Sequence, residues 1–291
     1  MYTAKNYIRV DSLEQAYELN KTRTNVVMGG LMWLKQSKKN INTLIDLSGL
    51  ELNNITDLES HIEIGAMVTL RQMEKSPVLQ KYFGDYFEKA FKSIVGVQFR
   101  NGATVGGSVF GRYGFSDVIT ALMPLETSIE VFNGSIENIP IEKFVSLKRD
   151  QSILSKIIIK KTESISSYES LRIISTDFPQ LSVSASLEKP KPDTNLSKLS
   201  IAVGARPGIA RLIVSDNFDI SELFTSYAQD VNNNSCASIN ELIEKYLLDD
   251  LNNLNYGSNL KASAQYRQIL SKALSAKVLR DLAAKGASSW K

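Results

Sequence analysis

The sequence predicts an α+β protein with two or three lobes, and three observations support this fold class. The chain has 291 residues, of which 43% are apolar, which is enough to give more than one lobe its own core. Short apolar runs alternate with helical patterns up to roughly residue 160, as in mixed α/β or α+β chains. After about residue 163 the chain becomes serine-rich, with alternating strands and then helices.

The N-terminal section predicts a strand, a glycine turn, a helix and a second strand. Ser12, with Gln15 three residues later, begins a first helix through a capping box. The apolar run NVVM (25–28) ends at Gly29-Gly30, LMWLKQS has a helical composition, and TLIDL (43–47) is strand-like.

The next section also alternates between strand and helix. It contains a glycine-rich stretch from Gly96 to Gly114 between two helical runs. In chain order, the predicted elements are a strand at HIEIGA, helices at TLRQMEKSPVLQKYF and DYFEKAFKSI, a helix near SDVITALMPLE, and strands at SIEVF and ILSKIIIKK.

A linker is predicted near residues 160–167. Beyond it, LSVSASLE and LSKLSIAVGA alternate in polarity and are joined by KPKPDTN, which predicts a hairpin. The C-terminal part is helical. In its last helix, spacing of i, i+3 and i+4 predicts core packing for Tyr266, Ile269, Leu270, Ala273 and Leu274.

Charge and hydropathy exclude two classes of partner. Lys and Arg total 34 against 31 Asp and Glu, and the signs are interspersed, so a nucleic-acid partner is not expected. Charged residues occur throughout the first twenty positions, and no apolar stretch is long enough to span a bilayer. We therefore expect a cytoplasmic protein without membrane insertion.

The chain has one cysteine, Cys236, and one histidine, His61. These counts exclude an intrachain disulfide, a four-cysteine iron–sulfur site and a Cys/His zinc site. We expect no metal site and no catalytic side chain, so any redox chemistry requires a bound cofactor. His61 is interpreted as an ordinary residue opening a strand, and Cys236 as a loop or helix-start residue.

Two glycine-bearing segments are candidate ligand loops: VVMGGLMWLK (26–35) and QFRNGATVGGSVFGRYGFSD (98–117). Glycine allows close approach of the backbone and positive φ, so that successive N–H groups can converge on an anion such as a pyrophosphate. Neither segment has the Rossmann or P-loop fingerprint. Each glycine pair alone is more often a tight turn, but two such loops could clasp one dinucleotide.

Taken in order, the motifs resemble the flavoprotein subunits of the xanthine dehydrogenase and carbon monoxide dehydrogenase family. VVMGGLMWLK resembles the first FAD loop, IEIGAMVTLRQME the I-G-A-x-x-T segment, and FRNGATVGGSVFGRYGFSD the second FAD loop. LIDLSGL resembles the strand after the first loop, and YESLRIISTDFPQLSVSASL, LSIAVGA and ASAQYRQILSKAL resemble the C-terminal domain. The resemblance covers nearly the full chain, and R-N-x-A-T-x-G-G is its most specific part.

The resemblance implies a PCMH-type FAD-binding fold over residues 1–163, with α/β subdomains at about 1–57 and 58–163. A small domain of antiparallel strands and helices would follow over 164–291. Residues of the first loop would wrap the FAD pyrophosphate, and residues of the second would close over it. The first set is Val26, Val27, Met28, Gly29, Gly30, Leu31, Met32 and Trp33, and the second is Thr104, Val105, Gly106, Gly107 and Ser108.

Three further positions match cofactor contacts of that family. Asp117 corresponds to the acidic residue that holds the adenosine end of FAD, while Ile94 and Leu154 correspond to apolar contacts. A helix N-cap is the alternative, compatible role for Asp117. Tyr168 lies where the family brings residues toward the isoalloxazine ring, although an exposed strand-edge tyrosine is the favoured interpretation.

Some residues depart from the family pattern. Met28, Leu31 and Met32 replace the usual neighbours of the first glycine pair, and Ser108 replaces an asparagine after the second. The substitutions affect side-chain contacts more than backbone contacts, because the glycines remain. Arg112 could reach a phosphate or a partner subunit, and a solvent-facing loop arginine is an equal expectation.

The resemblance implies a role in electron transfer. A large subunit with a molybdenum cofactor would oxidise the substrate, a small subunit would relay electrons through [2Fe-2S] clusters, and this chain would pass them through FAD to NAD or another acceptor. Two alternatives remain open: a free-standing flavin reductase with a related FAD fold, and a non-catalytic scaffold subunit.

Overall fold

The computed structural model describes residues 2–190 and 192–290, with the side chain of Ser289 also left out. The chain divides into two compact units. The first comprises the stretch ending at Tyr82, Ile94–Arg112 and Glu126–Lys161; the second comprises Phe83–Ser93, Tyr113–Leu125 and the stretch beginning at Thr162. The predicted linker includes the junction at residues 161 and 162, while the domain bounds 1–57, 58–163 and 164–291 stay predictions.

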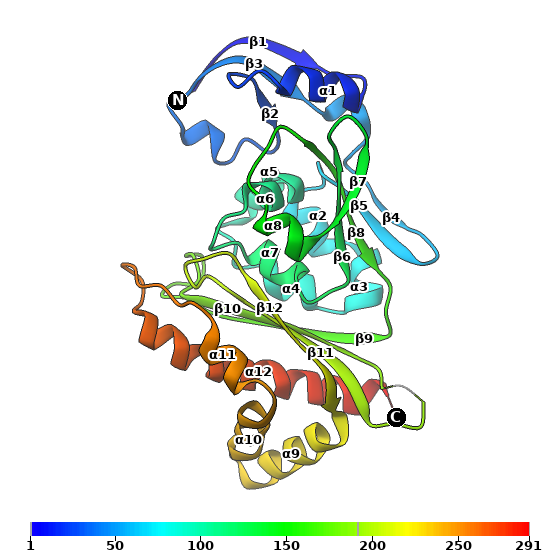
Figure 1. The fold of residues 1–291 in the computed structure, drawn as a ribbon, viewed down its shortest axis with the longest axis vertical. Helices are drawn as coiled ribbons and strands as arrows, with labels where there is room; N and C mark the ends of the chain where they lie inside the picture. The colour runs from blue at the N-terminus through cyan, green and yellow to red at the C-terminus, as the bar shows by residue number, and fades with distance from the viewer. Residues whose placement is uncertain (1, 191, 291) are drawn as a thin grey trace. The chain divides into compact units, whose positions relative to one another are not determined.

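The first unit begins with a three-stranded parallel sheet in the order β1-β3-β2 (Figure 1). Helix α1 connects its outer strands, and Ser12 caps the helix by accepting a hydrogen bond from the N–H of Gln15. Of the predicted helical segment LMWLKQS, only one 3-10 turn forms. The bounds are β1 Thr3–Arg9, α1 Leu13–Asn20, β2 Val26–Met28, η1 Leu34–Gln36, β3 Asn40–Asp46 and η2 Ser48–Leu50.

A five-stranded antiparallel sheet in the order β4-β5-β8-β6-β7 completes the first unit. Its isoleucines alternate along the strands, so that Ile62, Ile64, Ile129 and Ile157 are fully buried. The glycine-rich stretch was predicted as loop but forms two short helices, α5 and α6. The bounds are β4 Ile55–Asp57, β5 His61–Gly65, α2 Leu70–Lys75, α3 Pro77–Phe83, α5 Val97–Gly102, α6 Val105–Gly111, β6 Thr127–Phe132, β7 Ile136–Pro140, α8 Ile141–Ser146 and β8 Ile153–Lys160.

The second unit is a four-stranded antiparallel sheet covered on both faces (Figure 1). Helices α4 and α7 lie against one face, while α12 lies against the other, where α9 and α10 contact α12. The predicted hairpin is confirmed, because β10 pairs with β11 in antiparallel register from Ser182↔Gly204 to Leu187↔Leu199. The bounds are α4 Tyr86–Phe91, α7 Asp117–Leu122, β9 Ser164–Leu171, β10 Leu181–Glu188, β11 Leu196–Gly204, β12 Arg211–Asp219, α9 Ile220–Asn233, α10 Ala237–Tyr246, α11 Leu248–Asn253 and α12 Ala264–Ser289.

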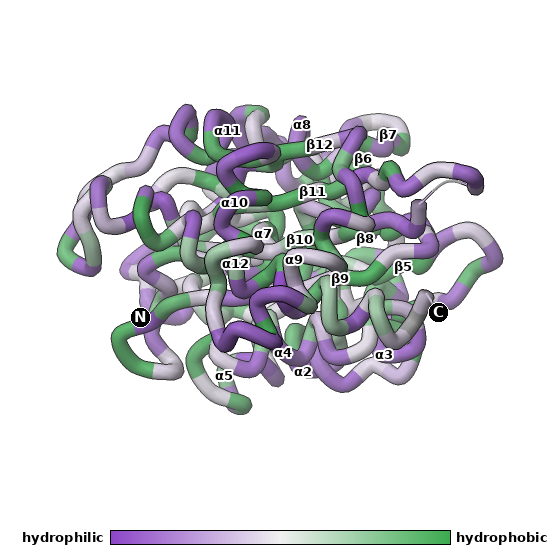
Figure 2. Tube along the Cα trace, turned by 90° about the horizontal axis from the view of Figure 1, so that it is seen from below, coloured by the Kyte–Doolittle hydropathy of each residue, from purple (hydrophilic) through white to green (hydrophobic). Residues whose placement is uncertain are grey.

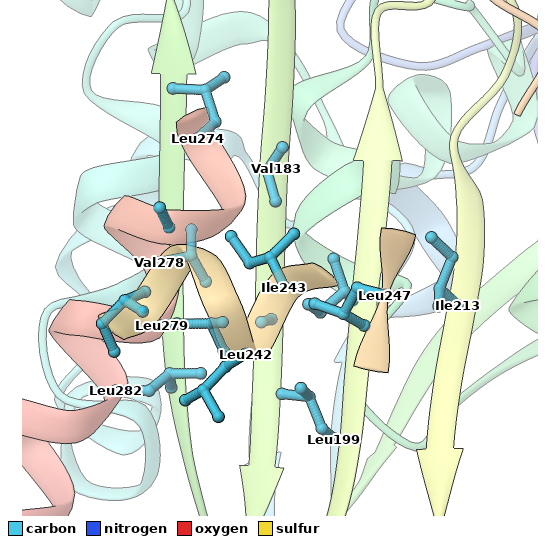
Figure 3. Close-up of a cluster of buried hydrophobic side chains, with 14 of the residues drawn as sticks. Val183, Leu199, Ile213, Leu242, Ile243, Leu247, Leu274, Val278, Leu279 and Leu282 are labelled. Carbon is cyan, nitrogen blue, oxygen red and sulfur yellow. The ribbon is translucent and has the colours of Figure 1, made fainter. Parts of the chain in front are cut away.

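Apolar side chains of α10 and α12 form the core of the second unit against the sheet. Figure 3 shows Leu242, Ile243, Val278 and Leu279 pointing toward strand residues such as Val183, and Figure 2 shows the hydrophobic run along β11. The prediction for the last helix was partly wrong. Leu270 and Leu274 are buried, but Ala273, Tyr266 and Ile269 are exposed, because the buried face continues through Val278, Leu279 and Leu282.

Within the described residues, no helix is both long and apolar enough to cross a membrane.

Candidate functional site

The two glycine-bearing segments meet inside the first unit. A Cβ on Gly29 would lie 2.9 Å from Oγ1 of Thr104 and 3.9 Å from Cα of Gly107. A Cβ on Gly30 would lie 1.6 Å from the carbonyl oxygen of Gly102, which is far too close for two non-bonded atoms. The first segment therefore packs backbone against backbone on the second, and only glycine fits at position 30 without a shift.

The first loop, Gly29–Trp33, presents backbone donors. Among the described residues, the N–H groups of Gly29, Gly30, Leu31 and Met32 donate to no protein oxygen. Leu31 has φ of +60°, which lies in the left-handed region that is costly for a branched side chain. A left-handed residue within a run of free amides is typical of an anion-binding concavity.

The second segment donates its N–H groups to other protein atoms. The N–H of Val105 donates to Val68 O at 2.8 Å, that of Gly106 to Ala66 O at 2.9 Å, and that of Gly107 to Thr104 Oγ1 at 3.2 Å. Gly106 and Gly107 lie in α6 and do not have positive φ, so the expectation of left-handed glycines was wrong here. A Cβ on Gly106 would lie 2.7 Å from Ala66 O; this glycine permits α6 to pack on the I-G-A segment.

A buried ion pair that the sequence analysis missed holds the second segment in place. Arg100 Nε lies 2.9 Å from Glu74 Oε2, and the two side chains are 4% and 3% exposed. Arg100 Nη1 also donates to Ile94 O, and Arg71 Nη1 lies 2.8 Å from Glu74 Oε1. Burial acts to raise the pKa of Glu74, but the two arginines outweigh it and hold the pKa below its ordinary value.

The remaining predicted contacts of the first unit lie on different elements. Ile94 is half-buried and precedes Val95, which is exposed and has φ of +50°. Leu154 is buried in β8, where it pairs with Val131 of β6. Val26 and Val27 are half-buried in β2.

Asp117 belongs to the second unit, where it lies at the first position of α7. Ser116 is the N-cap, with Oγ accepting a hydrogen bond from Ile119 N–H, so the capping role belongs to Ser116. The Asp117 carboxylate accepts a hydrogen bond from the Tyr168 hydroxyl and forms an ion pair with Arg172 at 2.7 Å. Burial raises the pKa of Asp117, against the opposing effects of Arg172 and Tyr168.

Tyr168 is not exposed, contrary to the expectation. β9 is an edge strand, but the Tyr168 side chain turns inward to Asp117 and is only 4% exposed. Burial, followed by the Asp117 charge, raises its pKa well above the ordinary value.

Arg112 does not face solvent either. It follows α6 in a left-handed conformation, with φ of +47°, and is 8% exposed. Its Nε donates to Phe144 O at 3.1 Å.

The single histidine and cysteine lie apart from these segments in the sequence. His61 opens β5, with Nδ1 2.9 Å from Ser60 Oγ. Cys236 is exposed and is the residue from which α10 begins, as expected. In the part of the chain that the structure describes, no three His, Cys, Asp or Glu side chains are grouped to hold a metal ion.

The first loop fits the pyrophosphate of a dinucleotide such as FAD. Its four free amides are consecutive in the described part of the chain, and a phosphoryl oxygen can accept hydrogen bonds from successive amides without a lysine. The second segment packs against this loop at Gly102 and Thr104. The residues present can therefore hold this cofactor mainly through backbone atoms.

Solved structures share this fold over almost the whole chain. A chain of carbon monoxide dehydrogenase from Hydrogenophaga pseudoflava is 16% identical with a TM-score of 0.78, covering 98% of this chain and 99% of that chain. A chain of quinoline 2-oxidoreductase from Pseudomonas putida 86 is 18% identical with a TM-score of 0.77 and the same coverage. At such identities the likeness concerns the fold, and it confirms the predicted fold class.

Curated relatives match about half of the chain, and a family model matches residues 2–163. The uncharacterized protein YgfM of Escherichia coli K12 is 25% identical over 160 residues, which are 54% of this chain and 59% of YgfM. The "Putative xanthine dehydrogenase FAD-binding subunit XdhB" of the same organism is 26% identical over 169 residues, 53% of this chain and 58% of that protein. The chain thus matches less than two thirds of each relative's length. Residues 2–163 match the family described as "FAD binding domain in molybdopterin dehydrogenase", and with more than half of its length matched, the chain belongs to this family of FAD-binding domains.

Proposed function

We propose that this chain is the FAD-binding, electron-transferring subunit of a molybdenum hydroxylase of the xanthine dehydrogenase type. The observation that carries the proposal is the first loop of the family-matched domain. Its four consecutive free amides are held against the second glycine segment, which supports cofactor binding through the pyrophosphate.

The proposed partners are a large subunit with a molybdenum cofactor and a small subunit with [2Fe-2S] clusters. One cysteine and one histidine are too few to ligate such clusters in this chain. Bound FAD would supply two-electron storage between the clusters and NAD or another acceptor. The surrounding complex would operate in the cytoplasm.

The proposed roles of the residues in this chain are to bind and orient the cofactor. Val26–Trp33 would wrap the pyrophosphate with backbone N–H groups. Thr104–Ser108 would support that loop, Asp117 would accept from a ribose hydroxyl, and Ile94 and Leu154 would supply apolar contacts. No side chain of the chain is assigned acid–base chemistry.

The first test is whether the purified full chain takes up FAD. We expect non-covalent binding with the two visible flavin bands, released on denaturation. Colourless protein that binds no added FAD would contradict the proposal and favour a non-catalytic scaffold.

The second test is reconstitution with molybdenum and iron–sulfur subunits. We expect no hydroxylation of purines by the isolated chain, and substrate-dependent reduction of its FAD only in the assembled complex. Hydroxylation by the isolated, partner-free chain would overturn the subunit assignment.

A further inference from the structure

The first loop rests on helix α5 through two side chains as well as through Gly30. Trp33, at the end of the loop, packs edge-on against Phe99 of α5, with ring centroids 6.1 Å apart and ring planes at 73°. Met32 lies over Gly102 of the same helix, where a Cβ would overlap Met32 Cε. Phe99 and Gly102 are three positions apart and therefore lie on one face of α5. Apolar contacts to that face anchor the loop.

Helix α5 is a fixed support, because the residue after Phe99 is locked by a buried ion pair. Arg100 Nε lies 2.9 Å from Glu74 Oε2, and Arg100 Nη1 donates to Ile94 O at 3.1 Å. The N–H of Ala103 donates to Phe99 O at 2.8 Å, which closes the end of the helix. The Phe99 ring is thus carried by backbone that is held in place independently of the loop.

The conformation of the first loop needs such support, because its own amides do not supply it. From Gly29 to Met32, they donate to no protein oxygen among the described residues. Leu31 has φ of +60°, in the left-handed region that is costly for a branched side chain and persists only where surrounding contacts outweigh the cost. The contacts of Met32 and Trp33 with α5 follow this residue directly.

We propose that Phe99 and Trp33 are positioning residues of the cofactor site: their packed rings hold the first loop in the conformation that presents its amides before a ligand binds. The inference rests on the proposed binding of FAD. It adds that the site is preorganised by side chains acting through the loop backbone. Apparent affinity falls with the fraction of molecules whose loop is in the competent conformation, so preorganisation contributes directly to affinity.

The test compares Phe99→Leu, Phe99→Tyr and the matched control Phe83→Leu in the full chain. Leucine keeps apolar volume at position 99 but removes the ring, whereas tyrosine keeps the ring. Phe83 is half-buried and packs edge-on against Phe87, with centroids 5.3 Å apart, so its replacement makes the same change outside both glycine segments. The chain has two tryptophans, and Trp290→Phe in every protein leaves Trp33 as the only one.

Two quantities are measured once melting has shown that each variant folds. Time-resolved fluorescence anisotropy of Trp33 in the FAD-free protein reports motion of the loop on the nanosecond scale, and titration with FAD gives the affinity. We expect Phe99→Leu to increase the motion of Trp33 and to weaken FAD binding by about five- to thirtyfold, since an edge-on aromatic pair and part of its buried area are lost. Phe99→Tyr and Phe83→Leu should match the parent in both quantities.

Parent-like FAD affinity of Phe99→Leu would overturn the inference. A loss of affinity without greater motion of Trp33 would overturn it too, because Phe99 would then act in some way other than holding the loop. Failure of the parent to bind FAD would instead contradict the proposed function. The anisotropy measurement needs no ligand and would still show whether Phe99 holds Trp33.

Discussion

Asp117 and Arg172 form a buried ion pair in the second unit, with Oδ1 and Nη2 2.7 Å apart and side chains 5% and 6% exposed. The Tyr168 hydroxyl donates to the same carboxylate oxygen. The residue proposed to hold a ribose hydroxyl therefore already neutralises a buried arginine. Its replacement is expected to lower stability, so the proposed effect on cofactor affinity has to be measured separately.

We predict that Asp117→Ala destabilises the FAD-free protein by about 3–5 kcal/mol, because it leaves the Arg172 charge buried without a partner. If Asp117 also accepts from FAD, the affinity of the folded fraction should fall about ten- to a hundredfold. Asp117→Asn keeps one hydrogen-bond acceptor without the charge, so it should lose part of the stability and part of the FAD affinity. Urea unfolding and FAD titration on both variants measure the two quantities.

A double variant, Asp117→Leu with Arg172→Met, provides the control. Removing both partners of a buried pair often costs little, so the stability should largely return. The FAD affinity of the double variant should remain low, because the proposed contact from Asp117 is still missing. Parent-like FAD affinity in the double variant would limit Asp117 to its structural role.

A second prediction concerns the contact between the glycine segments. Gly30→Ala should weaken FAD binding and lower the stability of the FAD-free protein by about 1–3 kcal/mol, because the new methyl would overlap Gly102 O. At Gly107, the added Cβ would meet only Thr104 Oγ1 at 3.0 Å, and alanine favours the helix over glycine. Gly107→Ala should therefore leave the melting temperature close to that of the parent.

Gly96→Ala is the matched control, since its Cβ would meet only Gln98 Oε1 at 3.4 Å. The melting temperature and the FAD affinity of Gly96→Ala should both be close to those of the parent. Parent-like stability and affinity of Gly30→Ala would mean that the two segments are not packed as the structure has them.

A third prediction follows from the Glu74–Arg100 pair. The pKa of Glu74 is held below its ordinary value of 4.5, so the folded protein binds this proton less readily than the unfolded chain. The stabilisation is then complete above the ordinary pKa and is lost as the pH falls through the lower folded value. Glu74→Gln should cost about 3–5 kcal/mol at neutral pH, and the difference from the parent should shrink in acid.

The measurement is urea unfolding of parent and variant over a pH series. Glu51→Gln, at an exposed position of the same unit, should show no such trend. A difference between parent and Glu74→Gln that stays constant from neutral pH into acid would contradict the assignment.

The sequence predicted most strands because their apolar runs are local signals. β5, β6 and β8 each bury alternate isoleucines or valines, and the β10–β11 hairpin follows from two such runs and a polar turn. β1 was missed because six of its seven residues are exposed. Its strand conformation comes from pairing with β3, which no local pattern records.

The sequence predicted which two segments form the candidate site, but it did not predict their local conformation or the side-chain pairs around them. Glycine content marked both segments, yet α6 forms across Gly106 and Gly107 because tertiary packing on Ala66 outweighs their low helix propensity. The partners of Asp117 are 51 and 55 positions away, at Tyr168 and Arg172. Such pairings depend on the fold and have no signature in spacing. The cofactor roles of these residues stay predictions.

The last prediction concerns Arg267, the largest fully buried side chain among the residues that the structure describes. Its guanidinium donates to the carbonyl oxygens of Gln180, Gly257 and Ala262, at 2.9, 2.5 and 2.7 Å, and to Oδ1 of Asn259 at 2.6 Å. One arginine thus ties the start of β10 to the segment that precedes α12. In the sequence, Arg267 was noticed only as part of the segment ASAQYRQILSKAL.

We expect Arg267→Met to destabilise the second unit by more than about 3 kcal/mol, since it leaves several buried acceptors unsatisfied. Hydrogen exchange should become faster at the amides of residues 255–263 and around Gln180, because the side chain that joins them is gone. Arg280→Met is the matched control: Arg280 lies on the same helix but donates to Ser235 O, so its loss should speed exchange near residue 235 instead. Faster exchange at residues 255–263 in Arg267→Met but not in Arg280→Met would show that Arg267 joins this segment to the region around Gln180. Equal exchange at residues 255–263 in both variants would show that backbone contacts alone fix the segment.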